Sequence, residues 1–259
     1  MSTGVWFVVP AAGVGSRMGG GPGAPAKQFR SLGGAPVLVR TLHALAPEAS
    51  GGIVVAVGEH EVEGVQALLS EPLSAVRVVV GGASRQASVA RGVAATPEAA
   101  GVVLVHDAVR PFVTREAVRA VTAAVRETGA AALAVPVADT LRRAAADTAS
   151  GEGPADSSAR GRFAETVDRA GLWRMQTPQG ARRDLLARAL AQAAADGLDA
   201  TDEVGALQHA GIPVALVPGD ERNIKLTRPA DWALAEALWA QRERAAREGA
   251  ARGGAGRES

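Results

Sequence analysis

The chain has 259 residues, 47% hydrophobic but only 3% aromatic, and a formal net charge of +1. These values suit one large α/β domain with an aliphatic core, and they exclude proteins that bind nucleic acid or anionic membranes through overall basic charge. The absence of cysteine excludes disulfides, thiolate metal sites and cysteine nucleophiles. With no apolar run near the roughly 20 residues that cross a bilayer and no signal-peptide pattern, we expect a cytoplasmic protein without membrane or nucleic-acid partners.

Short valine-rich runs alternate along the chain with longer segments of helical period. The runs are continuous and apolar, as expected for strands that are covered on both faces. The predicted strands are 5–9, 53–57, 76–80, 102–105, 131–135 and 214–217. Ser84 and Thr114 are predicted helix N-caps, and Pro229 suits the first turn of the last helix. This alternation predicts a Rossmann-like, mostly parallel sheet with helices on both faces.

Segment 139–168 interrupts this alternation. Short strands are predicted at 140–143 and 162–167, around a tip at 147–162 that is rich in Gly, Ser, Ala and Asp. We interpret the segment as a protruding two-stranded arm. Residues 1–240 are then expected to form a single domain with this excursion, and 241–259 a disordered tail that begins as a charged helix end.

A glycine-rich loop follows the first strand, where open α/β sheets bind ligands. It reads PAAGVGSRM from residue 10, and a Gly/Pro-rich run then leads to Lys27. Small residues let backbone N–H groups approach phosphates closely. The spacing matches neither the dinucleotide loop G-x-G-x-x-G nor the P-loop G-x-x-x-x-G-K-[ST]. The guanidinium of Arg17 and the ammonium of Lys27 therefore favour a polyphosphate ligand over an ordinary strand-to-helix turn.

Other polar segments follow later strands. GGASRQASV, from residue 81, indicates either a serine-capped helix start or a second ligand-facing loop that includes Ser88. HDAVRP, from residue 106, places Asp107 where it could hold Mg²⁺ beside phosphates or pair with Arg110 in a turn. Thr201-Asp202-Glu203 is typical of a helix cap with first-turn acids. Further polar islands are TVDR from 166, QTPQ from 176 and NIKLT from 223.

The first loop, with a Lys ahead of Gln, resembles the sugar-nucleotidyltransferase superfamily. One family within it matches P-A-A-G, G-G-x-x-R-x-x-S-V, H-D-A-x-R-P, D-T, T-V-D-R-x-x-L-W, Q-T-P-Q, T-D-E and N-I-K-x-T-x-P-x-D in this order. From about Val5 to about Leu238 the chain thus resembles the 2-C-methyl-D-erythritol 4-phosphate cytidylyltransferases of non-mevalonate isoprenoid biosynthesis. Val109 stands where that family more often has Ala, and the arm tip is longer and more polar than usual.

The resemblance implies transfer of CMP from CTP to the methylerythritol phosphate, giving 4-diphosphocytidyl-2-C-methyl-D-erythritol and pyrophosphate. It assigns Arg17 and Lys27 to the pentavalent α-phosphorus, Arg169 and Lys225 to the substrate phosphate, and Asp107 to Mg²⁺. The implied nucleotide contacts are Pro10, Ala11, Ala12, Gly13, Gly15, Gly82 and Ser88. The implied substrate contacts are Arg110, Thr140, Thr177 and Thr201. The resemblance also implies a homodimer formed through the arms, in which Thr140 and Arg169 serve the partner's site.

Three alternatives remain open from the sequence. A ribitol-5-phosphate cytidylyltransferase shares the front half and the T-V-D-R and N-I-K-x-T segments. A non-catalytic nucleotide-binding module is disfavoured because the chain offers two sets of phosphate-binding cations, one per substrate. An NAD-dependent oxidoreductase is disfavoured because the third glycine of the first loop comes one position late.

Overall fold

The computed structural model describes residues 4–13, 26–145 and 162–255, with side chains described up to residue 248. Gly15, Arg17 and residues 147–161 of the predicted arm tip lie outside these ranges. The chain divides into two compact units. Unit 1 comprises Met1–Ala134 with Gln176–Ser259, and unit 2 comprises Val135–Met175.

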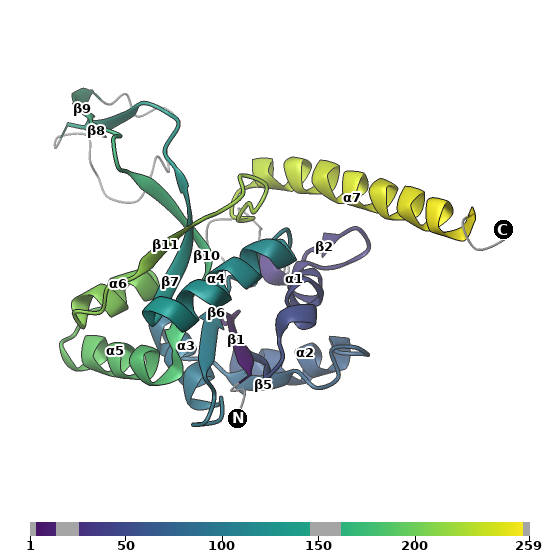
Figure 1. Cartoon of the computed structure of the whole chain (residues 1–259), viewed down its shortest axis with the longest axis horizontal. Coiled ribbons are helices and arrows are strands. Elements are labelled where there is room, and N and C mark those ends of the chain that lie inside the picture. Colours follow the sequence, from purple (N-terminus) through teal and green to yellow (C-terminus); the bar gives the residue numbers. More distant parts are fainter. Residues whose placement is uncertain (1–3, 14–25, 146–161, 256–259) are drawn as a thin grey trace. The chain divides into compact units, whose positions relative to one another are not determined.

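A seven-stranded sheet with the order β11-β7-β10-β6-β1-β4-β5 forms the centre of unit 1 (Figure 1). β1 pairs in parallel with β4 and β6, β4 with β5, and β7 with β11, whereas β10 runs antiparallel to β6. The strands are β1 (Val5–Pro10), β4 (Gly52–Val57), β5 (Arg77–Val80), β6 (Val102–Val105), β7 (Ala130–Pro136), β10 (Trp173–Arg182) and β11 (Ala215–Pro218). The predicted Rossmann-like sheet is confirmed, and the six predicted strands agree to within one residue at each end.

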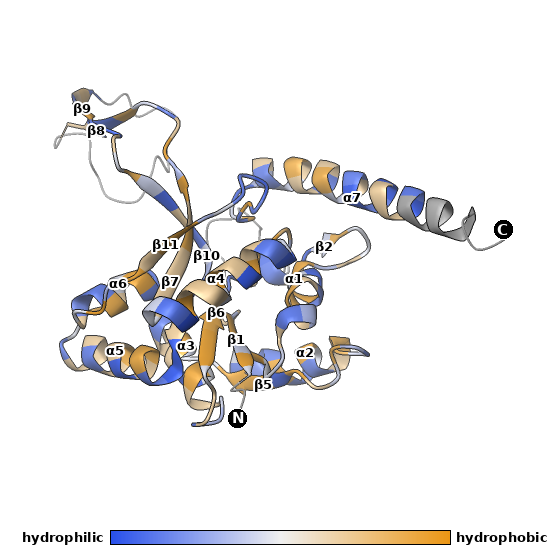
Figure 2. Ribbon diagram, viewed as in Figure 1, coloured by the Kyte–Doolittle hydropathy of each residue, from blue (hydrophilic) through white to orange (hydrophobic). Residues whose placement is uncertain are grey.

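Helices cover both faces of this sheet because its strands are apolar on both sides (Figure 2). Phe7 and Val9 of β1 pack in the cluster that includes α1, α2 and α4, whereas Val8 packs in the cluster that includes α3, α5 and α6. Ser84 and Thr114 cap α3 and α4 as predicted, with side chains that accept from Ala87 N and Ala117 N. The helices are α1 (Val37–Leu45), α2 (Val62–Leu68), α3 (Arg85–Ala94), α4 (Arg115–Thr128), α5 (Arg183–Ala195), α6 (Glu203–His209) and α7 (Pro229–Ala255).

Strand β10 was not predicted. Strand patterns are recognised by apolar residues, but Gln176, Thr177 and Gln179 are polar and Pro178 lacks an N–H donor. The three polar side chains are nevertheless buried, because each has hydrogen-bond partners within unit 1. At Gly180 a Cβ atom would overlap the carbonyl oxygen of Val103 on β6, so the close pairing of these strands requires glycine.

A third apolar cluster joins the start of α7 to a short hairpin of β2 (Ser31–Leu32) and β3 (Ala35–Pro36). Two arginines stack on α7 here, Arg30 at 4.3 Å from the Trp232 ring and Arg40 at 4.2 Å from the Trp239 ring. Helix α7 begins at Pro229 as predicted and remains helical past residue 240, where we expect the domain to end. No described helix is both long and apolar enough to cross a membrane. The 3₁₀ turns are η2 (Lys27–Phe29), η3 (Ala46–Glu48) and η4 (Glu59–Glu61).

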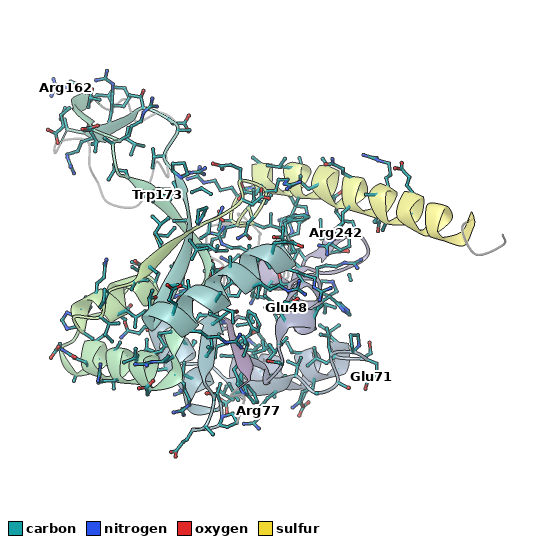
Figure 3. The ribbon with its side chains drawn as sticks, in the orientation of Figure 1. Glu48, Glu71, Arg77, Arg162, Trp173 and Arg242 are labelled. Atoms are coloured by element: carbon teal, nitrogen blue, oxygen red, sulfur yellow. The ribbon has the colours of Figure 1, made fainter. Side chains whose placement is uncertain are left out.

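Unit 2 contains an antiparallel pair of strands, β8 (Leu141–Ala144) and β9 (Phe163–Val167). Both agree with the predicted arm strands to within one residue. The pair is bridged by Arg143 Nε and Glu165 Oε1 at 2.7 Å. The surface of unit 2 is partly apolar, because Phe163 is 75% exposed and Trp173 at the start of β10, labelled in Figure 3, is 39% exposed.

Truncating a core leucine tests this packing. Leu104 lies fully buried in β6, so Leu104→Ala is expected to lower the free energy of unfolding by about 2–5 kcal/mol. Leu234 on α7 is 51% exposed, so Leu234→Ala should change it by about 0.5 kcal/mol or less. Denaturant unfolding measures both, and equal losses would contradict the described core.

Candidate active site

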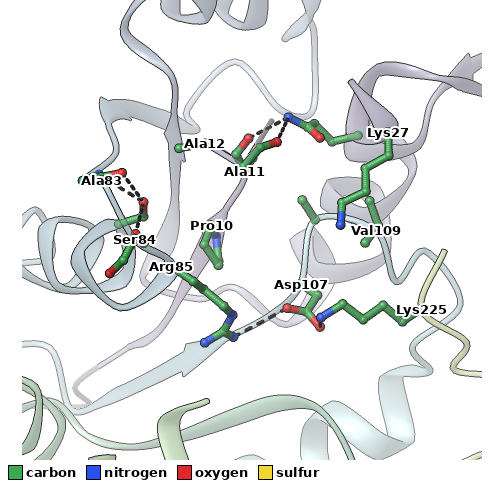
Figure 4. A pocket seen from close by; sticks show the side chains of 15 residues that line it. Pro10, Ala11, Ala12, Lys27, Ala83, Ser84, Arg85, Asp107, Val109 and Lys225 are labelled. Atoms are coloured by element: carbon green, nitrogen blue, oxygen red, sulfur yellow. Dashed lines mark hydrogen bonds and ion pairs between the residues drawn. The ribbon is translucent and has the colours of Figure 1, made fainter. Parts of the chain in front are cut away.

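The strand order reverses beside β1, which fixes where a ligand can enter. From β1 the chain builds β4 and β5 on one side and then places β6 on the other. Such a reversal opens a crevice beyond the carboxyl ends of the two strands that flank it. A cavity of about 240 Å³ lies there (Figure 4). Nine of the predicted site residues line it: Pro10, Ala11, Ala12, Gly13, Lys27, Gly82, Ser88, Asp107 and Lys225.

Gln28 holds Lys27 beside the loop that follows β1. Its side chain is 2% exposed, and Nε2 donates to the carbonyl oxygens of Ala11 at 2.8 Å and Gly13 at 3.4 Å. Lys27, the residue before Gln28, directs its ammonium into the cavity (Figure 4). The sequence pattern included this glutamine as the residue after Lys27, but it gave the side chain no role.

The glycine loop after β5 forms an adjoining wall. Ser88 Oγ accepts from Gly82 N at 3.0 Å and donates to the Ser84 carbonyl at 2.9 Å, so it shapes the loop from within. A Cβ atom on Gly81 would lie 2.6 Å from that of Ala12, and one on Gly82 would overlap Ala87. The two predicted ligand loops therefore meet, and their close approach requires glycine.

Asp107, just after β6, is a buried carboxylate surrounded by cations. Its Oδ2 lies 3.0 Å from Lys225 Nζ and 3.2 Å from Arg110 Nε, and its Oδ1 lies 3.5 Å from an Arg85 nitrogen. Burial opposes its ionisation, but the charges of Lys225, Arg85 and Arg110 hold the pKa of Asp107 well below its ordinary value. The carboxylate is therefore ionised at neutral pH, and it lines the cavity.

Arg85 and Glu203 form a pair that the sequence pattern did not reveal. Arg85 lines the cavity, and its two terminal nitrogens lie 2.7 and 3.1 Å from the carboxylate oxygens of Glu203. Burial opposes protonation of Arg85, but Glu203 and Asp107 hold its pKa above its ordinary value. Arg85 belonged to the G-G-x-x-R motif and Glu203 to T-D-E, where both resembled first-turn helix residues.

The sequence as a whole matches known proteins. A family model described as 2-C-methyl-D-erythritol 4-phosphate cytidylyltransferase, IspD, matches residues 5–241. This chain belongs to that family.

Several relatives carry the same name. The 2-C-methyl-D-erythritol 4-phosphate cytidylyltransferase of Salinibacter ruber is 51% identical over 235 residues, which are 90% of this chain and 91% of the relative. The Deinococcus radiodurans protein of the same name is 44% identical over 89% of this chain and 88% of its own length. The crystal structure of the Thermus thermophilus enzyme superposes with a TM-score of 0.72 at 35% identity, over 93% of this chain and 100% of that one. The predicted family is confirmed, and these names give no support to the ribitol-phosphate alternative.

Two of the implied IspD substrate contacts, Thr177 and Arg110, are buried and are not among the residues that line the cavity. Thr177 is 3% exposed, and its hydroxyl accepts from Asp107 N at 3.1 Å and lies 3.0 Å from His106 Nδ1. Arg110 donates to the Asn223 carbonyl oxygen at 2.6 Å as well as to Asp107. Among the described residues, the Thr177 side chain thus fixes the Asp107 turn to β10, and the Arg110 side chain fixes it to the loop that carries Lys225.

The remaining implied contacts lie elsewhere. Thr201 is exposed and precedes Asp202, whose carboxylate caps α6 by accepting from Gly205 N at 2.9 Å, as the predicted helix-cap reading requires. Thr140 and Arg169 belong to unit 2, where both are exposed and Arg169 donates to the Ala138 carbonyl oxygen.

The residues that line the cavity fit a divalent metal ion whose ligands come partly from the protein and partly from the substrate. The described residues contain no group of three or more His, Cys, Asp or Glu side chains that could enclose an ion. Mg²⁺ needs no such cage, because it commonly binds one or two carboxylates together with water and substrate phosphates. Asp107 supplies one ionised carboxylate at the cavity wall, so phosphate oxygens would complete the coordination.

His106 gives the fold a specific dependence on pH. Burial lowers its pKa to about 4, whereas an unfolded histidine titrates near about 6.5. Between these values the unfolded chain binds a proton that the folded chain does not, so stability falls as the pH is lowered through this window. From pH 7 to pH 5 this residue should cost about 2 kcal/mol of unfolding free energy.

His106→Asn should remove this part of the pH dependence. Denaturant unfolding at pH 7 and pH 5 compares the variant with the wild type, and the other histidines remain in both proteins. The same loss in both would show that His106 is not buried in its neutral form.

Proposed function

We propose that this chain transfers CMP from CTP to 2-C-methyl-D-erythritol 4-phosphate, giving 4-diphosphocytidyl-2-C-methyl-D-erythritol and pyrophosphate in non-mevalonate isoprenoid biosynthesis. One observation carries the proposal. The sequence contains two lysines, Lys27 and Lys225, and both line the same cavity as Asp107. Membership of the IspD family supplies the identity of the two substrates.

The reaction asks for charge neutralisation more than for proton transfer. The nucleophile is an oxygen of the substrate phosphate, which is already anionic at neutral pH, so no general base is needed. The barrier lies in bringing two polyanions together, and positioned cations lower it by stabilising charge as the transition state forms. The cavity is suited to this, because Lys27 and Lys225 enter it from different segments of the chain.

Each substrate is assigned its own set of side chains. Lys27, with Arg17, stabilises the α-phosphorus, and Lys225, with Arg169, positions the attacking phosphate. The backbone from Pro10 to Gly13, together with Gly15, Gly82 and Ser88, holds the nucleotide. Arg110, Thr140, Thr177 and Thr201 complete the substrate side. Arg169 and Thr140 act from the partner of a homodimer formed through the arm.

Asp107 would hold Mg²⁺, which would supply positive charge to offset that of the triphosphate. Lys225 contacts the Oδ2 atom of this carboxylate in the structure, and its ammonium would turn to the substrate phosphate when the substrate binds. The reaction consumes a nucleoside triphosphate, which the cytoplasm supplies. We therefore propose that the enzyme acts in the cytoplasm.

Removal of either lysine is expected to reduce turnover strongly. Lys27→Ala and Lys225→Ala should each lower the rate of pyrophosphate release by roughly 10²–10³-fold, as for other single electrostatic groups at reacting centres. The assay contains CTP, Mg²⁺ and methylerythritol phosphate. Arg77→Ala is the matched control, because it also removes one positive charge but at an exposed position on β5 that does not line the cavity. This variant should keep a rate near that of the wild type. Full activity of Lys27→Ala would contradict the proposal.

Because the sequence contains only two lysines, chemical modification can show which lysine each substrate covers. A lysine-directed acetylating reagent can modify Lys27, Lys225 and the terminal amine, and mass spectrometry separates the three sites. CTP with Mg²⁺ is expected to protect Lys27 more than tenfold, and methylerythritol phosphate added with an unreactive CTP analogue should protect Lys225. Protection of neither lysine would show that the cavity does not bind these substrates.

A further inference from the structure

The two oxygens of the Asp107 carboxylate are engaged differently. Oδ2 contacts both Lys225, at 3.0 Å, and Arg110, at 3.2 Å. Among the described residues Oδ1 has a single ion-pair contact, with Arg85 at 3.5 Å. A close charge-assisted hydrogen bond would be about 2.7–2.9 Å long, so Oδ1 retains more capacity to bind another cation.

Glu203 explains why Arg85 does not close on Oδ1. Its carboxylate faces both terminal nitrogens of Arg85, and this bidentate geometry fixes the plane of the guanidinium. Glu203 cannot follow Arg85 toward Asp107, because it is 1% exposed and lies in the first turn of α6. Gln179 Oε1 accepts from the backbone N–H of Glu203 at 3.1 Å and that of Val204 at 3.2 Å, and this fixes the turn to β10.

We propose that Glu203 is a positioning residue that restrains Arg85 from Asp107 and so keeps Asp107 Oδ1 available to a divalent cation. The inference rests on the proposed role of Asp107 as the Mg²⁺ ligand. Without the charge of Glu203, the Arg85 guanidinium gains a closer partner in Oδ1 and competes with the ion. A residue that never touches substrate or metal thereby sets the affinity of the metal site.

Calorimetric titration of CTP, with Mg²⁺ and with EDTA, isolates this effect. The metal enhancement is the CTP affinity measured with Mg²⁺ divided by that measured with EDTA. CTP binding in EDTA also shows that each variant is folded. Glu203→Gln is expected to reduce the enhancement about tenfold. The double variant Glu203→Gln/Arg85→Gln should restore it, because the competing cation is gone, whereas a merely structural role of Glu203 would leave the double variant at least as impaired.

Two controls separate the possible failures. Asp107→Asn should abolish the enhancement. Glu48→Gln should preserve it, because Glu48 (labelled in Figure 3) pairs with Arg115 and Arg119 and does not line the cavity. No enhancement in the wild type would refute the proposed metal role of Asp107. An intact enhancement in folded Glu203→Gln would overturn the present inference alone.

Arg85→Gln provides a second test if Glu203→Gln does not fold. This single variant removes the competitor and should keep or increase the enhancement. Loss of the enhancement in Arg85→Gln would show that Arg85 supports the metal site, and this too would overturn the inference.

Discussion

An ionised carboxylate buried at the end of β6 is the constraint on which the site depends. Burial of an unpaired charge costs several kcal/mol, so Asp107 is stable there only because cations surround it. They come from three separate segments: Arg85 from the start of α3, Arg110 from the turn after β6, and Lys225 from the loop before α7. Two of these cations, Arg110 and Lys225, are also among the residues that we propose to bind the phosphorylated substrate.

The fold places these charges together through its strand order. β1 and β6 are parallel neighbours, and the chain places β4 and β5 on one side of β1 but β6 on the other. The loops after β1 and β6 therefore open into one crevice. β10, antiparallel to β6, then brings Thr177 and Gln179 under Asp107 and Glu203. The buried polar residues of β10 thus act as the support for the site. This explains why a strand that resembles a polar loop in sequence lies inside a sheet.

The sequence predicts those parts of the structure that depend on local chemistry. The continuous apolar runs predicted six strands, Ser84 and Thr114 predicted two helix starts, and the glycine loop with Lys27 predicted residues that line the cavity. The ordered motifs led to the family, whose model matches residues 5–241. By contrast, β10 carries no apolar pattern, and the pairing of Arg85 with Glu203 joins residues 118 positions apart. The burial of Thr177 and Arg110 depends in the same way on partners distant in sequence. Such contacts depend on how the folded elements pack, and a single sequence does not reveal which distant residues come together.

The most direct test of the central claim is pyrophosphate release by the wild-type chain with CTP and Mg²⁺, measured with two alternative acceptors. We expect rapid release with 2-C-methyl-D-erythritol 4-phosphate and a far lower kcat/KM with ribitol 5-phosphate. A preference for ribitol 5-phosphate, or no release with either acceptor, would contradict the central claim.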